Sequence, residues 1–121
     1  MYVIDTNILI YDAAGDVKVG EFLNTRRHEI FYLPTIVIVE FLAYPLITKD
    51  TIEKFRLFTS QTILINLDSV IAERAGEMRK NYKLKLADAI IAASALTTRS
   101  TLLTRNIKDF RRVRDLSIIS P

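Results

Sequence analysis

The chain is 121 residues long, which suits a single domain with its own buried core over residues 1–121. Half of the residues are hydrophobic and 26% are charged, so the composition is globular and excludes a disordered or low-complexity chain. The absence of Cys excludes a disulfide scaffold and a thiol nucleophile, and the single His argues against a His-based metal site. We therefore expect any chemistry to rest on carboxylates, hydroxyls and basic groups.

Charge is divided unevenly along the chain, although the net charge is only +3. Residues 1–73 carry 6 Lys and Arg against 10 Asp and Glu, whereas residues 74–121 carry 11 against 4. This division suits a metal site on one side and a bound polyanion on the other. Two solvated helix faces of opposite sign explain it as well, and charge alone favours that structural explanation.

No segment has the pattern of an export signal or a membrane span. The chain enters the apolar residues 2–4 directly after Met1, without the basic start and long apolar core of a secretory signal. The densest apolar stretch, residues 36–47, is interrupted by Glu40 and Pro45, which argues against a span there. We therefore expect a cytoplasmic protein with no membrane association.

Apolar runs alternate with amphipathic segments in the first half of the chain. The elements predicted there are, in order, a strand at 2–4, a helix ending near 11, a helix after 16, a strand at 30–33, a helix at 36–44 and a helix at 50–59. The segment 36–44 is ambiguous, because its four consecutive β-branched residues favour a strand, whereas its length and a cap at Thr35 favour a helix. We predict a helix there.

The same alternation continues in the second half of the chain. The elements predicted there are, in order, a strand at 62–67, a helix from about 69 to 82, a helix at 84–98, a strand at 101–103, a short helix at 106–112 and a strand at 116–119. Strands that alternate with helices predict an α/β sandwich around a parallel sheet.

Most of the 14 acidic residues have a structural explanation. Asp16, Asp50 and Asp68 stand at predicted helix starts, where a short acidic side chain caps the helix by accepting a hydrogen bond from a backbone N–H. Asp12 and Asp115 fall in predicted connections.

Three acids do not fit such explanations. Asp5 stands at the carboxyl end of the first strand, the edge where open α/β sheets bind ligands, although it would also serve as a helix cap. Glu40 has apolar neighbours on both sides, so we expect it to be buried, with a single Lys or Arg partner as the structural alternative. Asp88 lies within an apolar run that predicts a buried helix, and a cap near the helix start is its structural alternative.

Three carboxylates that point into one region repel each other, and a divalent cation relieves that repulsion. Oxygen ligands without His or Cys favour Mg²⁺ or Mn²⁺ over zinc. Such an ion can activate water and stabilise the charge of a phosphoryl displacement. The basic second half of the chain would then hold a phosphate backbone.

Four segments of the sequence resemble motifs of the PIN-domain family of metal-dependent ribonucleases, and in particular of the VapC toxins. They occur in the family's order and span essentially residues 1–120: residues 3–10, 39–45, 86–95 and 103–110. The resemblance implies a three-layer α/β/α sandwich with a central, mainly parallel sheet. It also implies that Asp5, Glu40 and Asp88 are catalytic and ligate Mg²⁺ or Mn²⁺.

The resemblance carries further expectations about the site and the partners. Thr6 would hydrogen-bond near Asp5, and Asn7 would hold the turn that follows. The reaction would be hydrolysis of an RNA phosphodiester by an activated water. Relatives of this kind form homodimers and are silenced by a VapB-type antitoxin. Two other functions stay open, a housekeeping RNA-processing nuclease and a non-catalytic module that binds RNA or protein.

The fourth segment departs from the family pattern. Asn106 stands where many members carry an acid, and Asp109 follows three residues later, on the same helix face. We therefore expect Asn106 to shape the site and Asp109 to join its catalytic carboxylates, with the number of bound metals left open. An ion pair between Asp109 and Arg105 or Arg112 is the structural alternative.

Basic residues gather on both sides of the last two motifs. Those near the final motif that we expect to contact RNA are Arg105, Lys108 and Arg111. A solvated surface or an antitoxin-facing patch would have the same composition. A phosphatase with an aspartate nucleophile is disfavoured, because the second Asp that it needs is replaced by Asn7.

Overall fold

A single five-stranded sheet organises the structure, a computed structural model that describes residues 1–121. All of its strand pairs are parallel, and the strand order is β3-β2-β1-β4-β5. The strands are β1 (Tyr2–Ile4), β2 (Phe31–Pro34), β3 (Ile63–Ile65), β4 (Thr101–Leu103) and β5 (Ile118–Ile119). The predicted parallel α/β architecture is confirmed.

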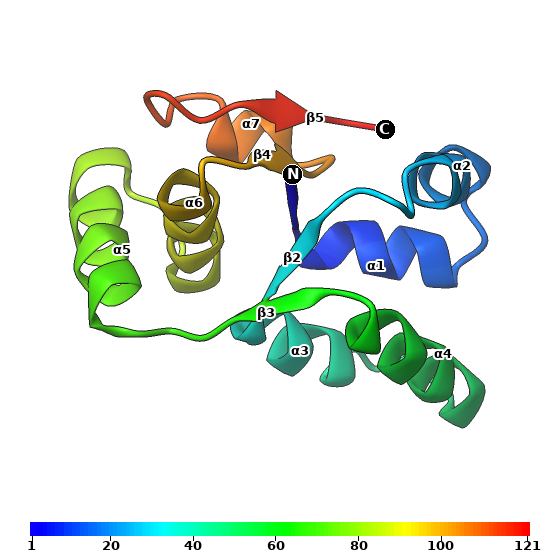
Figure 1. The fold of residues 1–121 in the computed structure, drawn as a ribbon. Coiled ribbons are helices and arrows are strands. Elements are labelled where there is room, and N and C mark those ends of the chain that lie inside the picture. The colour runs from blue at the N-terminus through cyan, green and yellow to red at the C-terminus, as the bar shows by residue number, and fades with distance from the viewer.

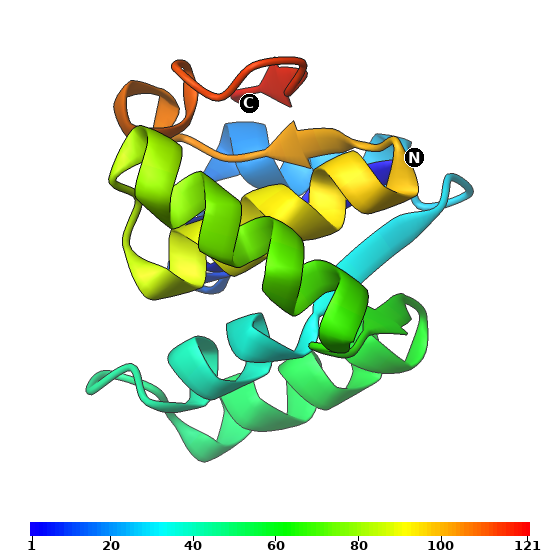
Figure 2. The same ribbon diagram turned by 90° about the vertical axis from the view of Figure 1, so that its left-hand side faces the viewer.

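Helices cover both faces of this sheet. They are α1 (Thr6–Ala13), α2 (Val17–Thr25), α3 (Thr35–Leu42), α4 (Lys49–Ser60), α5 (Ser69–Tyr82), α6 (Leu86–Thr98) and α7 (Ile107–Phe110). In Figure 1, α5 and α6 lie on one side of the strands, and α1 and α2 lie on the other. The view from the α5–α6 side shows these two helices packed side by side across the sheet (Figure 2). The result is the three-layer sandwich that the sequence predicts.

The core lies on both faces of the central strands, and α6 supplies the largest share of its helical residues. Both faces of β1 and β4 are covered, which explains why these strands read as uninterrupted apolar runs. The small side chains of α6 let that helix lie close to the sheet, and its buried members are Ala89, Ile90, Ile91, Ala92, Ala93, Ser94 and Ala95. This packing fixes the start of α6, where Asp88 stands.

The ambiguous segment at 36–44 is helical, as α3. The expected cap at Thr35 is wrong, because Pro34 occupies the N-cap position without a side-chain hydrogen bond and Thr35 is already helical. Proline suits that position, since its φ is fixed and it has no N–H to satisfy.

Two of the three predicted aspartate caps are confirmed. Asp16 accepts from the Val19 N–H at 3.1 Å, and Asp68 accepts from the Ile71 N–H at 2.9 Å. The expected cap at Asp50 is wrong, because Thr48 caps α4 and Asp50 lies in its first turn, paired with Lys54 at 3.0 Å.

None of the helices combines the length and apolarity that a membrane crossing needs.

Candidate functional site

The candidate site is built at the carboxyl edge of the sheet, around Asp5. Asp5 follows β1 directly, and its backbone N–H donates to the carbonyl of Leu103 on β4 at 3.0 Å. One carboxylate oxygen accepts from the Thr6 N–H at 2.8 Å, so Asp5 is also the N-cap of α1. Only 5% of the residue is exposed. Asp5 is therefore both a helix cap and a residue at the edge of the sheet where such folds bind ligands.

Thr104 is the residue that the sequence analysis missed. It is fully buried, and its hydroxyl donates to the second carboxylate oxygen of Asp5 at 2.6 Å. The same hydroxyl accepts from the Asn106 N–H at 2.9 Å and from the Asn7 side chain at 3.5 Å. Thr104 could have been found from its position immediately after β4. Because β4 is the parallel neighbour of β1, this position lies opposite Asp5.

Asn7 and Thr6 both form hydrogen bonds at this edge of the sheet, with different partners. Asn7 also accepts from the Arg105 N–H at 3.4 Å, so it joins the turn after β1 to the turn after β4. The hydroxyl of Thr6 donates to Glu40 Oε1 at 2.6 Å. Thr6 therefore holds a second carboxylate beside the turn that Asp5 caps.

The expectation that Glu40 is buried is wrong. Glu40 lies on an exposed face of α3, beside Val39, which is 63% exposed. The apolar neighbours misled the prediction because α3 carries apolar residues on its outer face as well as on its buried one. The hydrogen-bond partner of Glu40 is Thr6, and Glu40 takes part in no ion pair.

Asp88 and Asp109 approach the site from the basic half of the chain. Asp88 stands in the first turn of α6 and is partly buried, so the buried helix is confirmed. The alternative of a cap is wrong, because Lys85 occupies the N-cap position and α6 has no side-chain cap. Asp109 lies on α7 and accepts from the Asn106 side chain at 2.8 Å. The ion pair of Asp109 with Arg105 or Arg112 is not formed, because Arg105 pairs with Asp16 and Arg112 pairs with no acid.

The pKa values show that these acids form one group. Burial raises the pKa of Asp5 to about 6, and the charges of Asp88 and Glu40 add to this rise, while hydrogen bonds from Thr104 and Thr6 oppose it. Burial also raises the pKa of Asp88, as do the nearby charges of Asp109 and Glu40. We call Asp5, Glu40, Asp88 and Asp109 the carboxylate cluster.

The donor set of the carboxylate cluster fits a hard divalent cation, since it contains only oxygen. Mutual repulsion of its members is the condition that a cation relieves. As the side chains stand, no three acidic residues lie close enough together to hold one ion.

The basic residues of the fourth motif differ in their surroundings. Arg105 donates two hydrogen bonds to Asp16, at 2.7 and 2.8 Å, and its guanidinium lies 4.5 Å from the centre of the Tyr11 ring. Lys108 and Arg111 are exposed and form no ion pair. Contact of these three residues with RNA stays a prediction.

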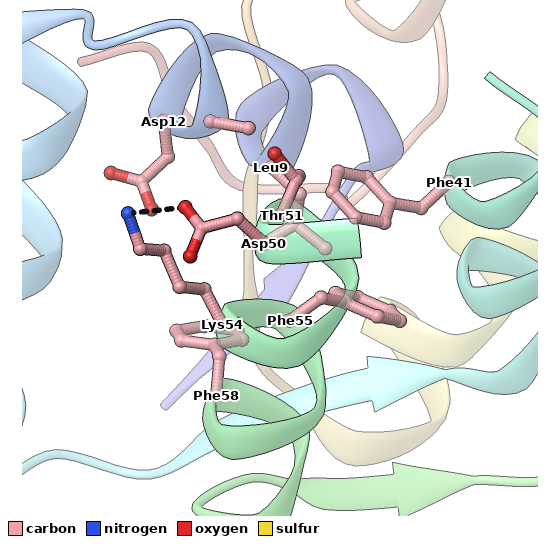
Figure 3. A pocket seen from close by; sticks show the side chains of 9 residues that line it. Leu9, Asp12, Phe41, Asp50, Thr51, Lys54, Phe55 and Phe58 are labelled. Atoms are coloured by element: carbon pink, nitrogen blue, oxygen red, sulfur yellow. Dashed lines mark ion pairs between the residues drawn. The ribbon is translucent and has the colours of Figure 1, made fainter. Parts of the chain in front are cut away.

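A separate cavity of about 200 Å³ lies between α1 and α4 (Figure 3). Phe41, Phe55 and Phe58 form much of its wall. Its charged lining residues are Asp12, Asp50 and Lys54, of which Asp50 and Lys54 form an ion pair at 3.0 Å. The prediction that Asp12 lies in a connection is wrong, because α1 extends past it to Ala13. No member of the carboxylate cluster lines this cavity, so it is distinct from the candidate site.

A parallel sheet between two helical layers, with acidic side chains at its carboxyl edge, defines an α/β protein whose site lies where such sheets bind ligands. The chain belongs to the PIN-domain family, whose model, described as "PIN domain", matches residues 2–116. The resemblance seen in the four sequence motifs is therefore confirmed.

Known proteins of this family resemble the chain over its whole length. Ribonuclease VapC2 of Rickettsia felis is 27% identical over 127 aligned positions, which cover 96% of this chain and 94% of that protein. A toxin–antitoxin complex from Klebsiella pneumoniae contains a chain that is 32% identical, with a TM-score of 0.84 and coverage of 98% and 96%. The structure of VapBC2 from Rickettsia felis bound to a promoter DNA fragment has the same fold, at 22% identity, a TM-score of 0.84 and coverage of 99% and 98%.

The raised pKa of Asp5 predicts a pH-dependent stability of the metal-free protein. Because the native state holds the Asp5 proton more tightly than the unfolded state, the contribution of Asp5 to the free energy of unfolding falls as pH rises from about 4 through 6. The loss amounts to about 3 kcal/mol in total, from a pKa change of about two units. Urea unfolding in EDTA at pH 4 and pH 7 should show this fall for the wild type relative to Asp5→Asn.

Thr104 supplies the control for this effect. Thr104→Val removes the hydroxyl that lowers the pKa of Asp5, so the fall in stability should extend to higher pH, whereas Thr104→Ser should keep the wild-type profile. Parallel pH profiles for the wild type and Asp5→Asn would contradict the described environment of Asp5.

Proposed function

We propose that this chain is a metal-dependent ribonuclease and the toxin of a VapBC-type toxin–antitoxin pair. The observation that carries the proposal is the carboxylate cluster, in which the buried Asp5 lies under the influence of the charges of Glu40 and Asp88 at the ligand-binding edge of the sheet. The names of the relatives support the reaction class and the toxin role.

The residues suited to hold Mg²⁺ or Mn²⁺ are Asp5, Glu40 and Asp88. When bound, such an ion supplies activation of water and stabilisation of charge at the scissile phosphodiester. The chain itself fixes the ligands. Thr104 and the Thr6 N–H hold both oxygens of Asp5, and the Thr6 hydroxyl holds one oxygen of Glu40. Asn106 orients Asp109 next to Asp88, where Asp109 adds negative charge at the edge of the site.

Two other functions are less well supported. A non-catalytic RNA-binding or protein-binding module has no use for a buried carboxylate that raises the free energy of the folded chain at neutral pH. A housekeeping RNA-processing nuclease would use the same cluster, and the toxin–antitoxin names of the relatives favour the toxin instead.

Substitution of the carboxylates tests the reaction. Asp5→Asn and Asp88→Asn should each reduce Mg²⁺- or Mn²⁺-dependent cleavage of total RNA more than about a hundredfold, because each removes a ligand charge while leaving the shape of the side chain. EDTA should abolish cleavage by the wild type. Gel analysis of RNA fragments measures the rates, and circular dichroism checks that each variant is folded.

Asp115→Asn is the matched control. Asp115 is exposed and has a φ of 66°, a conformation that Asn adopts readily, so this variant should cut RNA at the wild-type rate. Wild-type cleavage by Asp88→Asn would remove Asp88 from the site. A wild-type protein that cuts no RNA with either metal would favour the non-catalytic module.

We also propose two protein partners. A VapB-type antitoxin is proposed because several proteins of similar fold occur in toxin–antitoxin complexes.

A second copy of the chain is proposed because large apolar residues stand exposed beside the site. Val39 is 63% exposed next to Glu40, and Leu86 is 58% exposed two residues before Asp88. The helices that carry them, α3 and α6, contact each other.

Light scattering after gel filtration tests the homodimer. The wild type should elute at twice the mass of one chain, and the double variant Val39→Asp/Leu86→Asp at the mass of one chain, because the charges would have to be buried in the interface. Val17→Asp is the control, since Val17 is 70% exposed on α2. A monomeric wild type at micromolar concentration would contradict the homodimer.

A further inference from the structure

A small pocket of about 90 Å³ lies beside two members of the carboxylate cluster. Asp88 and Asp109 form one part of its lining. The remaining residues that line it are Lys83, Leu84, Lys85 and Arg112. We call it the basic pocket, because three cations face it against two carboxylates.

The turn between α5 and α6 places two of these cations, Lys83 and Lys85, at the surface of the pocket. Leu84 is buried at 6% exposure, so the residues on either side of it, Lys83 and Lys85, are both left at the surface. Lys83 ends α5 in the left-handed conformation, with a φ of 55°, which reverses the chain. Arg79 donates to the carbonyl of Leu84 at 3.2 Å and so braces the turn.

Arg112 reaches the same pocket from the other side. One of its guanidinium nitrogens donates to the carbonyl of Tyr82, the last residue of α5, at 3.2 Å. This contact anchors Arg112 beside the α5–α6 turn, while the guanidinium keeps further N–H donors for another acceptor. The segment after α7 is tied to α5 a second time, because the Arg114 N–H donates to the hydroxyl of Tyr82 at 3.2 Å.

None of the three cations has an acidic partner of its own. The chain forms two ion pairs, Lys54 with Asp50 and Arg105 with Asp16, and both lie away from the basic pocket. The charge of Lys85 does act on Asp88, because it opposes the rise in the pKa of the Asp88 carboxyl. Three exposed, unpaired cations beside a carboxylate site are the groups that bind a phosphate.

We propose that Lys83, Lys85 and Arg112 form a subsite that binds a backbone phosphate of the RNA strand, next to the phosphodiester that is cut. The subsite rests on the proposed ribonuclease function and does not include Arg105. Arg105 is less available for that role, because Asp16 and the Pro121 oxygen already accept from three of its five N–H donors and Asp16 neutralises its charge.

The subsite explains how one edge of the protein combines carboxylates with a polyanion. The carboxylate cluster alone repels RNA, and the cations of the basic pocket hold the strand beside it. Arg112 can bind two phosphate oxygens at once through its planar guanidinium, whereas each lysine acts as a point charge. Loss of one such contact weakens binding to every RNA sequence similarly, because phosphate contacts carry no base information.

Binding of RNA in EDTA tests the subsite without cleavage. The probe is a short single-stranded RNA with a 5′ fluorescein, and fluorescence anisotropy gives its Kd for the full chain at several salt concentrations. Lys85→Gln and Arg112→Gln should each raise Kd about threefold to tenfold and reduce the slope of log K against log salt by about 0.7. The triple variant with Lys83→Gln should lose more than either.

A matched control makes the result specific. Lys18→Gln changes an exposed lysine on α2 and should keep Kd within twofold of the wild type. Lys108→Gln and Arg111→Gln change the predicted RNA contacts of the fourth motif, and each should raise Kd by less than Lys85→Gln or Arg112→Gln does. Equal Kd values for the wild type, Lys85→Gln and Arg112→Gln would overturn the subsite, as would a larger loss in Lys108→Gln or Arg111→Gln.

The same proteins separate the subsite from the ribonuclease proposal. If the pocket variants lose RNA binding but the wild type cuts no RNA with Mg²⁺ or Mn²⁺, the subsite stands and the ribonuclease function fails. If the wild type cuts RNA and the pocket variants bind it normally, the ribonuclease function stands and the subsite is overturned.

Discussion

The buried carboxylate of Asp5 is the constraint on which the rest of the site depends. A carboxylate at this depth is costly unless its oxygens are satisfied, and the parallel register of β1 and β4 supplies the partner, Thr104, from 99 residues away. The turns after both strands are then joined through Asn7, and Thr6 brings in Glu40 from α3. One buried charge thus ties together three segments that are distant in the sequence.

The cost of burying Asp5 among other acids is not fully offset. Hydrogen bonds lower the pKa of Asp5, but burial and the charges of Asp88 and Glu40 outweigh them. The folded chain therefore holds a cluster of acids that is unfavourable in itself, which is the condition that the proposed cation would relieve. Around it, the protein keeps unpaired cations at the α5–α6 turn. Lys85 lies only three residues before Asp88, so positive and negative side chains stand close together at this edge, as the proposed binding of a cation and an RNA strand would need.

Much of the fold could be predicted from the sequence, because buried parallel strands appear as short apolar runs and α6 as a long apolar helix. Asp5 could be found because it ends the first of these runs. Glu40 was expected to be buried because the sequence cannot show that α3 has an apolar outer face. Thr104 was missed because a threonine after a strand is common, and only the pairing of β1 with β4 places it on Asp5. The Arg105–Asp16 pair could not be predicted for the same reason, because only the fold brings together these residues, which are 89 positions apart.

The central claim is that the carboxylate cluster binds a divalent cation through Asp5 and Asp88. Calorimetric titration of the full chain with Mn²⁺ tests it most directly. The account predicts binding at pH 7 that weakens about tenfold per pH unit below 6, as Asp5 takes up its proton, and that is much weaker in Asp88→Asn. An absence of heat at millimolar Mn²⁺, or equal affinity in Asp88→Asn and the wild type, would contradict it.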